Sequence, residues 1–164
     1  MEIRYINSED NLFKISKIYE ESWKYAYKGL IPESFLDSLE SGRWVSFLEL
    51  EDINTIVMTE NGEYIGTSSF CASRFEEHQS AGEIVSIYLM PEYMGKGWGR
   101  KLINVVLEEL RKQGYREIFL YVLEENKKAI RFYENSGFMR ENDYLEDKIG
   151  GKSVREVRYT RTFE

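Results

Sequence analysis

The chain has 164 residues, of which 42% are hydrophobic and 31% are charged, with a formal net charge of −7. This length suits a single domain, over residues 1–164, with a full hydrophobic core. No apolar run approaches the length of a membrane span, and the acidic balance disfavours nucleic acid as a partner. The start, Met1-Glu2-Ile3-Arg4, lacks a secretion leader, and the one cysteine, Cys71, cannot form an internal disulfide. We therefore expect a cytoplasmic protein with no membrane partner.

The first half of the chain predicts a strand, several helices and a hairpin. In chain order we expect a strand at 3–6, helices at 10–27, 32–39 and 42–48, and strands at 55–60 and 64–72. The last two strands flank Asn61-Gly62, the strongest short hairpin signal. Residues 74–81 are polar and predict a loop.

The second half predicts a strand at 83–89, a glycine-rich loop, and a helix that carries Leu102 to Leu110 and ends before Gly114. A strand at 117–122, a helix at 126–136, and strands at 138–147 and 153–162 follow. A strand, a helix and a strand around the glycine loop predict local parallel pairing, and the hairpins on either side predict a mixed sheet.

The glycine-rich loop is the most informative segment of the chain. Its glycines are Gly95, Gly97 and Gly99, and its cations are Lys96, Arg100 and Lys101. A loop without Cβ atoms can form a nest of backbone N–H groups, and the helix start adds unpaired N–H groups and positive dipole. The segment therefore predicts a site for a phosphate or pyrophosphate.

Three other interpretations of this loop exist. The Walker A loop is excluded because Gly97, and not Ser or Thr, follows Lys96. The dinucleotide fingerprint stays open: Gly95 and Gly97 fit, Arg100 replaces the third glycine, and Glu117 stands near the distance of a ribose-binding acid. A glycine-rich turn without a ligand stays open as well.

Two motifs resemble the GNAT superfamily of N-acetyltransferases. Residues 94–99 resemble the pyrophosphate loop of this family. The usual pattern of that loop is Gln or Arg, two variable residues, Gly, one variable residue, and then Gly or Ala. Gly97 and Gly99 match this pattern, whereas Met94 departs from the usual Gln or Arg. Residues 126–138 resemble the family's later motif, with its Asn, Ala, Phe-Tyr pair and Gly-Phe at the usual spacing. The resemblance implies an α/β fold, a GNAT-like mixed central sheet with helices on both faces.

The resemblance also implies a reaction. Acetyl-CoA would be the cosubstrate, and its acetyl group would pass directly, in a ternary complex, to a primary amine of a small molecule or a protein, with no metal. A non-catalytic domain that binds or senses acyl-CoA is the alternative, and a homodimer stays open. The coenzyme-binding residues implied are Ile87, Tyr88, Leu89, Met94, Gly95, Lys96, Gly97, Trp98, Gly99, Arg100 and Asn126.

For catalysis, Tyr133 matches the family's tyrosine that protonates the departing thiolate, and a core aromatic beside Phe132 is the alternative. Glu83 is the first candidate for the base, against an ordinary exposed glutamate at a strand end. His78 is the only histidine, and its polar loop favours a solvated side chain. The family also places a β-bulge near Leu89, where backbone N–H groups polarise the thioester carbonyl.

Two further sets of residues are expected to be structural. Cys71 is expected to pack within its strand and to carry no acyl group. Trp23, Tyr25, Tyr27 and Phe35 lie in the region that shapes the acceptor pocket in related proteins, although helix packing explains these aromatics as well and is favoured.

Overall fold

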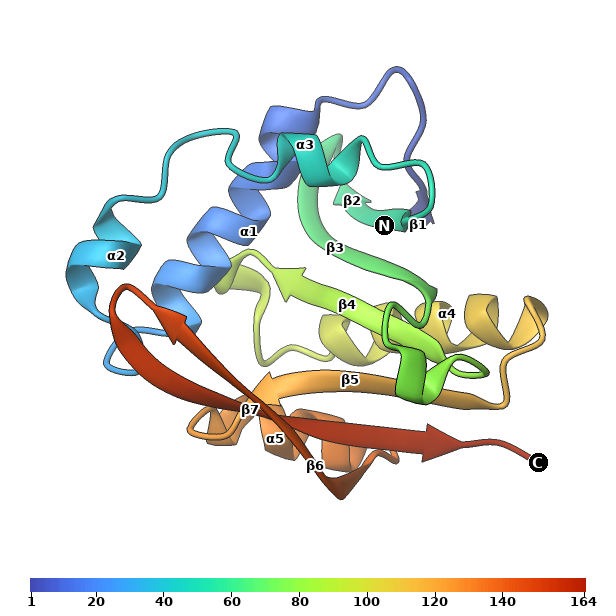
Figure 1. Cartoon of the computed structure of the whole chain (residues 1–164). Helices are drawn as coiled ribbons and strands as arrows, with labels where there is room; N and C mark the ends of the chain where they lie inside the picture. The colour runs from blue at the N-terminus through green and yellow to red at the C-terminus, as the bar shows by residue number, and fades with distance from the viewer.

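Seven strands form one mixed sheet in the computed structural model, which describes residues 1–164 (Figure 1). The strands are β1 (Glu2–Tyr5), β2 (Asn54–Glu60), β3 (Glu63–Ala72), β4 (Gly82–Leu89), β5 (Glu117–Leu123), β6 (Met139–Ile149) and β7 (Lys152–Thr162). The helices are α1 (Leu12–Ala26), α2 (Glu33–Asp37), α3 (Val45–Leu48), α4 (Trp98–Lys112) and α5 (Lys127–Asn135). The strands lie in the sheet in the order β1-β2-β3-β4-β5-β7-β6, and only β4 and β5 pair in parallel. The predicted mixed sheet is confirmed.

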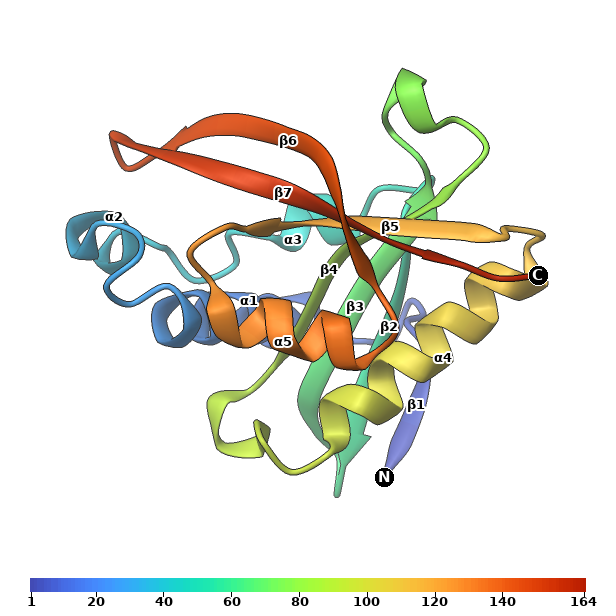
Figure 2. The same cartoon turned by 90° about the horizontal axis from the view of Figure 1, so that it is seen from below.

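Helices cover both faces of the sheet, as the resemblance implied. Along β2, Ile56 and Met58 belong to the core formed with α4 and α5, whereas Val57 packs with α1. This alternation follows from the two-residue repeat of a strand. Figure 1 shows α1 above the strands and α5 below them, and Figure 2, seen from below, brings α4 and α5 to the front. We call these two sides the α1 face and the α4 face.

The parallel pair is short, and the two strands then part. β4 and β5 pair only at Gly82–Ile118 and Glu83–Phe119, although both strands continue for several more residues. Figure 1 shows them diverging toward their C-terminal ends. The backbone edges that face each other across this gap lack strand partners, so a ligand can pair with them.

A β-bulge accompanies the parting of the strands. Ser69 pairs with Ser86 and Phe70 pairs with Ile84, so Val85 is the extra residue of β4. The expected position near Leu89 is therefore wrong by four residues. A bulge bends its strand and increases the local twist, which turns the rest of β4 away from β5.

Glycines end two helices as predicted. Gly114 follows α4 with φ of 100°, and Gly137 follows α5 with φ of 90°. Both occupy the left-handed region that favours glycine after a helix. The loop expected at 74–81 contains one turn of 3₁₀ helix, η1 (Glu76–His78).

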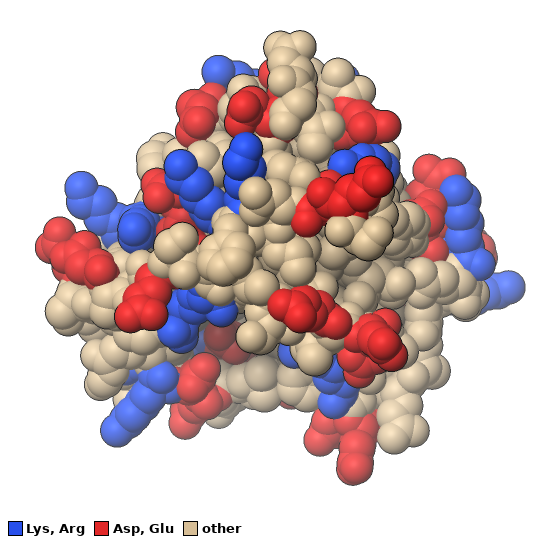
Figure 3. Space-filling view, turned by 90° about the horizontal axis from the view of Figure 1, so that it is seen from above, with Lys and Arg blue, Asp and Glu red and all other residues tan.

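On the surface that carries α1 to α3, basic and acidic side chains are mixed, and Figure 3 shows no large patch that is only positive or only negative. The excess of seven negative charges is therefore not gathered on this side. None of the helices combines the length and apolar character needed to cross a membrane.

Candidate active site

A cavity of about 970 Å³ lies at the parting of β4 and β5. Its lining includes β4 from Glu83 to Leu89, the glycine loop, α5, the end of α1, and parts of the hairpin formed by β6 and β7. Leu120 and Val122 belong to the core of the α4 face, whereas Leu123 packs with α2 on the α1 face, and all three line the cavity. The cavity therefore joins the two faces of the sheet through the gap.

The three glycines of the loop serve two different purposes. Gly95 and Gly97 have φ of 72° and 90°, and a Cβ at either would meet no atom within 4 Å. These positions need glycine for their backbone conformation, and the space above them is open. Gly99 lies inside α4, where a Cβ would stand 3.2 Å from the Phe132 ring, so its reason is close packing on α5.

The cations beside this loop have no protein anion as a partner. Arg100 lines the cavity, while the ammonium groups of Lys96 and Lys101 lie 6.0 and 4.7 Å from the ring centres of Tyr93 and Trp98. None of the three cations forms an ion pair. Together with the unpaired N–H groups at the start of α4, they favour an anion at this place.

Most residues expected to bind a coenzyme line the cavity. Those on the lining are Ile87, Tyr88, Leu89, Met94, Gly95, Gly97, Gly99, Arg100 and Asn126. Lys96 and Trp98 do not line it. Asn126 also caps α5, because its Oδ1 accepts a hydrogen bond of 3.2 Å from the N–H of Ala129.

Tyr133 lines the same cavity, and its hydroxyl makes no hydrogen bond within the protein. Burial, and then the nearby Tyr88, raises the pKa of Tyr133 above that of an ordinary phenol. The group is therefore a neutral phenol at physiological pH, able to donate a proton or a hydrogen bond. Tyr88 in turn accepts a hydrogen bond of 3.1 Å from Trp23 Nε1.

Glu83 is not the exposed strand-end residue that one interpretation expected. Only 2% of it is exposed, and Arg74 donates three hydrogen bonds to its carboxylate. The shortest joins Arg74 Nη2 to Glu83 Oε2 at 2.6 Å. Glu83 lines the cavity, and its role as the base stays a prediction.

The expectation of a solvated His78 is wrong. Its side chain is 15% exposed, and its Nε2 lies 2.9 Å from Asp143 Oδ2 on β6. The reason is that the loop between β3 and β4 folds back over β5. There the ring of His78 packs against Phe119 and the ring of Phe75 packs against Tyr121, with centres 5.2 Å apart in each pair.

The aromatics at the end of α1 contribute both to the cavity wall and to packing between side chains. Trp23, Tyr25 and Tyr27 line the cavity, whereas Phe35 does not. Trp23 also packs edge-on against Tyr27, with ring centres 4.9 Å apart. Packing is confirmed for Trp23, Tyr27 and Phe35, and a role of these aromatics in shaping an acceptor pocket stays a prediction.

One polar residue of the cavity was missed by the sequence analysis. Glu156 lies on β7, lines the cavity, and makes neither a hydrogen bond nor an ion pair. Burial, and then the charge of Asp147, raises the pKa of Glu156, while Arg74 opposes the change. No motif surrounds it, and only the alternation of faces along β7 could have indicated that it points inward.

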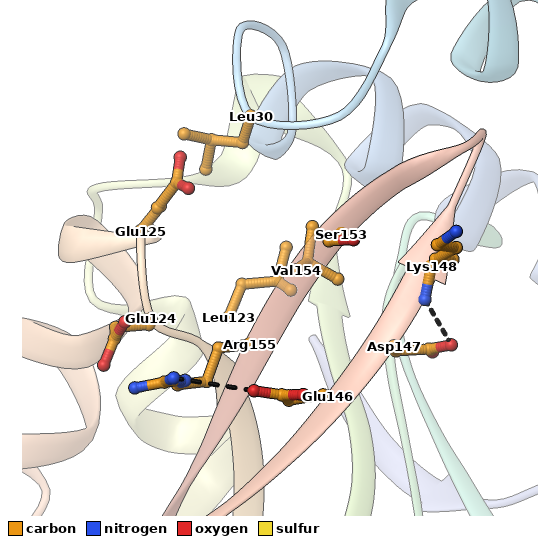
Figure 4. Close-up of a pocket in the computed structure, with 10 residues that line it drawn as sticks. All are labelled: Leu30, Leu123, Glu124, Glu125, Glu146, Asp147, Lys148, Ser153, Val154 and Arg155. Atoms are coloured by element: carbon orange, nitrogen blue, oxygen red, sulfur yellow. Dashed lines mark hydrogen bonds and ion pairs between the residues drawn. The ribbon is translucent and has the colours of Figure 1, made fainter.

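A second hollow, of about 690 Å³, lies beside the first, between the start of α5 and the β6–β7 hairpin (Figure 4). Its four carboxylates all have partners. Glu124 pairs with Arg140, Glu125 with Lys152 and Glu146 with Arg155, and Asp147 accepts from the N–H of Lys148. This hollow offers paired charges, unlike the free carboxylate of Glu156.

Comparisons with known proteins identify the relatives of this chain. A family model described as Acetyltransferase (GNAT) family matches residues 14–138. The chain is 30% identical over 152 residues to an uncharacterized N-acetyltransferase, YuaI, of Bacillus subtilis, covering 90% of this chain and 86% of that protein. It is 26% identical over 168 residues to a spermidine N(1)-acetyltransferase of Thermoplasma acidophilum, covering 97% and 98%. The crystal structure of the PaiA N-acetyltransferase of Thermoplasma acidophilum, in complex with coenzyme A, has a TM-score of 0.79 at 23% identity and covers 99% and 98% of the two chains.

The environment of Cys71 predicts an unreactive thiol. Burial, and then the charge of Glu83, raises the pKa of Cys71 to about 11, and only 3% of the residue is exposed. We expect iodoacetamide at pH 8 to alkylate the folded protein at least about 100-fold more slowly than the protein unfolded in urea, because thiolate is the reactive form. Mass spectrometry measures both rates, and equal rates would contradict the assignment.

Proposed function

The chain belongs to the GNAT family of acetyltransferases, and from that membership we propose that this N-acetyltransferase moves the acetyl group of acetyl-CoA to a cationic primary amine. One observation carries the proposal. Gly95 and Gly97, with positive φ and open space above them, line the same cavity as Tyr133, whose hydroxyl makes no hydrogen bond within the protein. A site that only bound acyl-CoA would need the first of these features and not the second.

The coenzyme lies between the parted strands in this proposal. Its pyrophosphate is bound by backbone N–H groups from Gly95 to Arg100, with the Arg100 guanidinium adding charge. Its pantetheine extends along the edge of β4 that has no strand partner beyond Glu83. Backbone N–H groups near Leu89 polarise the thioester carbonyl, and such donors contribute most where charge develops in the transition state.

Acetyl transfer then needs a neutral amine and a protonated leaving group. A lysine-like amine is neutral in only about one molecule in 2,500 at pH 7, so a base must remove its proton. Tyr133 supplies the proton that the thiolate takes up. The buried thiol of Cys71 is a poor nucleophile, which supports direct transfer in a ternary complex over an acyl-enzyme.

Two observations support an inference about the chemical class of the acceptor. The Thermoplasma relative is named as acting on spermidine, a polyamine. The cavity of this chain contains a carboxylate without a partner, which suits an ammonium group. We infer a small aliphatic amine of this kind as the acceptor. A single domain, self-association as a homodimer and a cytoplasmic location stay predictions.

A panel of amines tests the proposal. Purified protein is incubated with acetyl-CoA and spermidine, 1,4-diaminobutane, glycinamide or short peptides, and the released thiol is followed by absorbance. We expect thiol release that depends on the amine and matches the acetylated product in mass spectrometry. Tight acetyl-CoA binding without thiol release across the panel would instead support a binding or sensing domain.

The glycine loop gives a prediction with a matched control. Alanine is strained at a positive φ, so Gly97→Ala displaces the N–H groups of the nest or puts a methyl group into the open space. We expect the Kd for acetyl-CoA, measured by calorimetry, to rise at least about tenfold. Gly62→Ala, with φ of 79° in the β2–β3 hairpin and equally open space, imposes similar strain and should leave the Kd unchanged. An equal Kd in both variants would remove the loop from the site.

Tyr133→Phe tests the proton donor. We expect kcat to fall about 10²–10⁴-fold, since the variant keeps the ring and loses only the hydroxyl that protonates the thiolate. The Kd for acetyl-CoA should stay within about twofold. Tyr25→Phe, which removes a more exposed cavity hydroxyl, is the control and should retain kcat. An unchanged kcat in Tyr133→Phe would exclude this role.

A further inference from the structure

The cavity contains only two carboxylates, Glu83 and Glu156. Arg74 donates three hydrogen bonds to Glu83, from its backbone N–H, Nε and Nη2, so this carboxylate already has its cation. Removing a proton from an amine at Glu83 would compete with that pair. Glu156 forms no ion pair, and Arg74 acts on it only through a weaker, longer-range attraction.

The two residues that flank Glu156 in the sheet are apolar. In the sheet it stands opposite Leu123 on one side and Leu145 on the other, and both leucines line the cavity. Leu123 is the last residue of β5, at the end where that strand has separated from β4. A negative charge without a partner in such surroundings is costly, and an entering cation would relieve that cost.

The charged and titratable groups around Glu156 come from three further elements. Asp147 of β6 raises its pKa by repulsion, Arg74 of the β3–β4 loop lowers it, and burial has the largest effect, in the raising direction. Tyr27, at the end of α1, has its own pKa raised in part by Glu156, so the two groups are electrostatic neighbours. A carboxylate with a raised pKa binds a proton more readily at working pH than an ordinary glutamate does.

We propose that Glu156 binds the ammonium group of the acceptor and is the base that removes its proton, while Glu83 holds Arg74 in position. This assignment rests on the proposed function. It goes beyond it by identifying the residue that recognises the acceptor, on a strand that neither motif includes.

The protons and bonds of the step balance. The Glu156 carboxylate takes one proton from R–NH₃⁺, and the lone pair of the resulting R–NH₂ forms the C–N bond at the thioester carbonyl. The carbonyl π electrons move to oxygen, and their return breaks the C–S bond. The Tyr133 hydroxyl gives its proton to the departing sulfur and regains one from the acylated nitrogen. The products are the amide, the free thiol of coenzyme A and one proton on Glu156, which passes to solvent.

The test compares Glu156→Gln with wild type on two acceptors that differ in basicity, spermidine and glycinamide. Without the base, only amine that is already neutral can react, about one molecule in 2,500 for a lysine-like amine and about one in ten for an α-amino group at pH 7. We expect kcat/KM at pH 7 to fall at least about 100-fold for spermidine and about tenfold or less for glycinamide. A general loss of structure would lower both equally.

The pH profile gives a second readout. Wild-type kcat/KM for spermidine should decrease below the raised pKa of Glu156 and level off above it, because the ionised carboxylate is the active form. In Glu156→Gln, kcat/KM for spermidine should rise about tenfold per pH unit through the neutral range, because the fraction of neutral amine rises at that rate. Glu83→Gln should keep the wild-type form of the profile. If the pH-independent part of the kcat/KM profile is lost in Glu83→Gln and kept in Glu156→Gln, the assignment of the base to Glu156 is overturned.

Two controls separate this inference from the proposed function. Glu146→Gln changes an exposed carboxylate of the same hairpin and should retain wild-type rates. Acetyl-CoA should bind Glu156→Gln with an unchanged Kd. Wild-type protein that acetylates neither amine would overturn the acceptor class and this inference with it. Active wild type with an equally active Glu156→Gln would overturn the inference alone.

Discussion

The separation of β4 from β5 after two residue pairs is the constraint on which the rest of the structure depends. A continuous ladder there would satisfy the backbone of both strands and close the sheet. The extra residue Val85 turns β4 away, and the gap exposes polar backbone edges that a ligand must satisfy. The glycine loop at the end of β4, the hydroxyl of Tyr133 and the carboxylate of Glu156 all line this one opening.

The cavity separates the two kinds of charge that acetyl transfer brings together. Unpaired cations and backbone N–H groups gather at the start of α4, where an anionic coenzyme would bind. The free carboxylate comes from β7, at the opposite side of the parted strands. Between them the wall is mainly apolar and aromatic. Low polarity in this middle region strengthens each electrostatic interaction at the reacting atoms.

Local chemistry made part of this predictable from the sequence. The loop of Gly95 and Gly97 was recognisable because positive φ angles and open space demand glycine, and the core followed from hydrophobic periodicity. Pairings between distant segments were not predictable. His78 was expected to be solvated because its partner, Asp143, is 65 residues away in the sequence. The ion pair of Glu83 with Arg74 forms only when the β3–β4 loop folds back. Glu156 lies outside both motifs, in a strand whose alternation alone does not distinguish it.

The hydrogen bond from Ser22 Oγ to the backbone carbonyl of Leu89, 2.6 Å long, joins α1 to the end of β4, and both residues line the cavity. A substitution that moves α1 must therefore either break this bond or move the end of β4 with the helix. Substitutions in α1 that reshape the cavity for a new amine would also disturb the β4 edge along which the coenzyme is proposed to lie. Under the proposed function, the shape of the acceptor pocket and the rate of turnover would therefore not vary independently when α1 is changed.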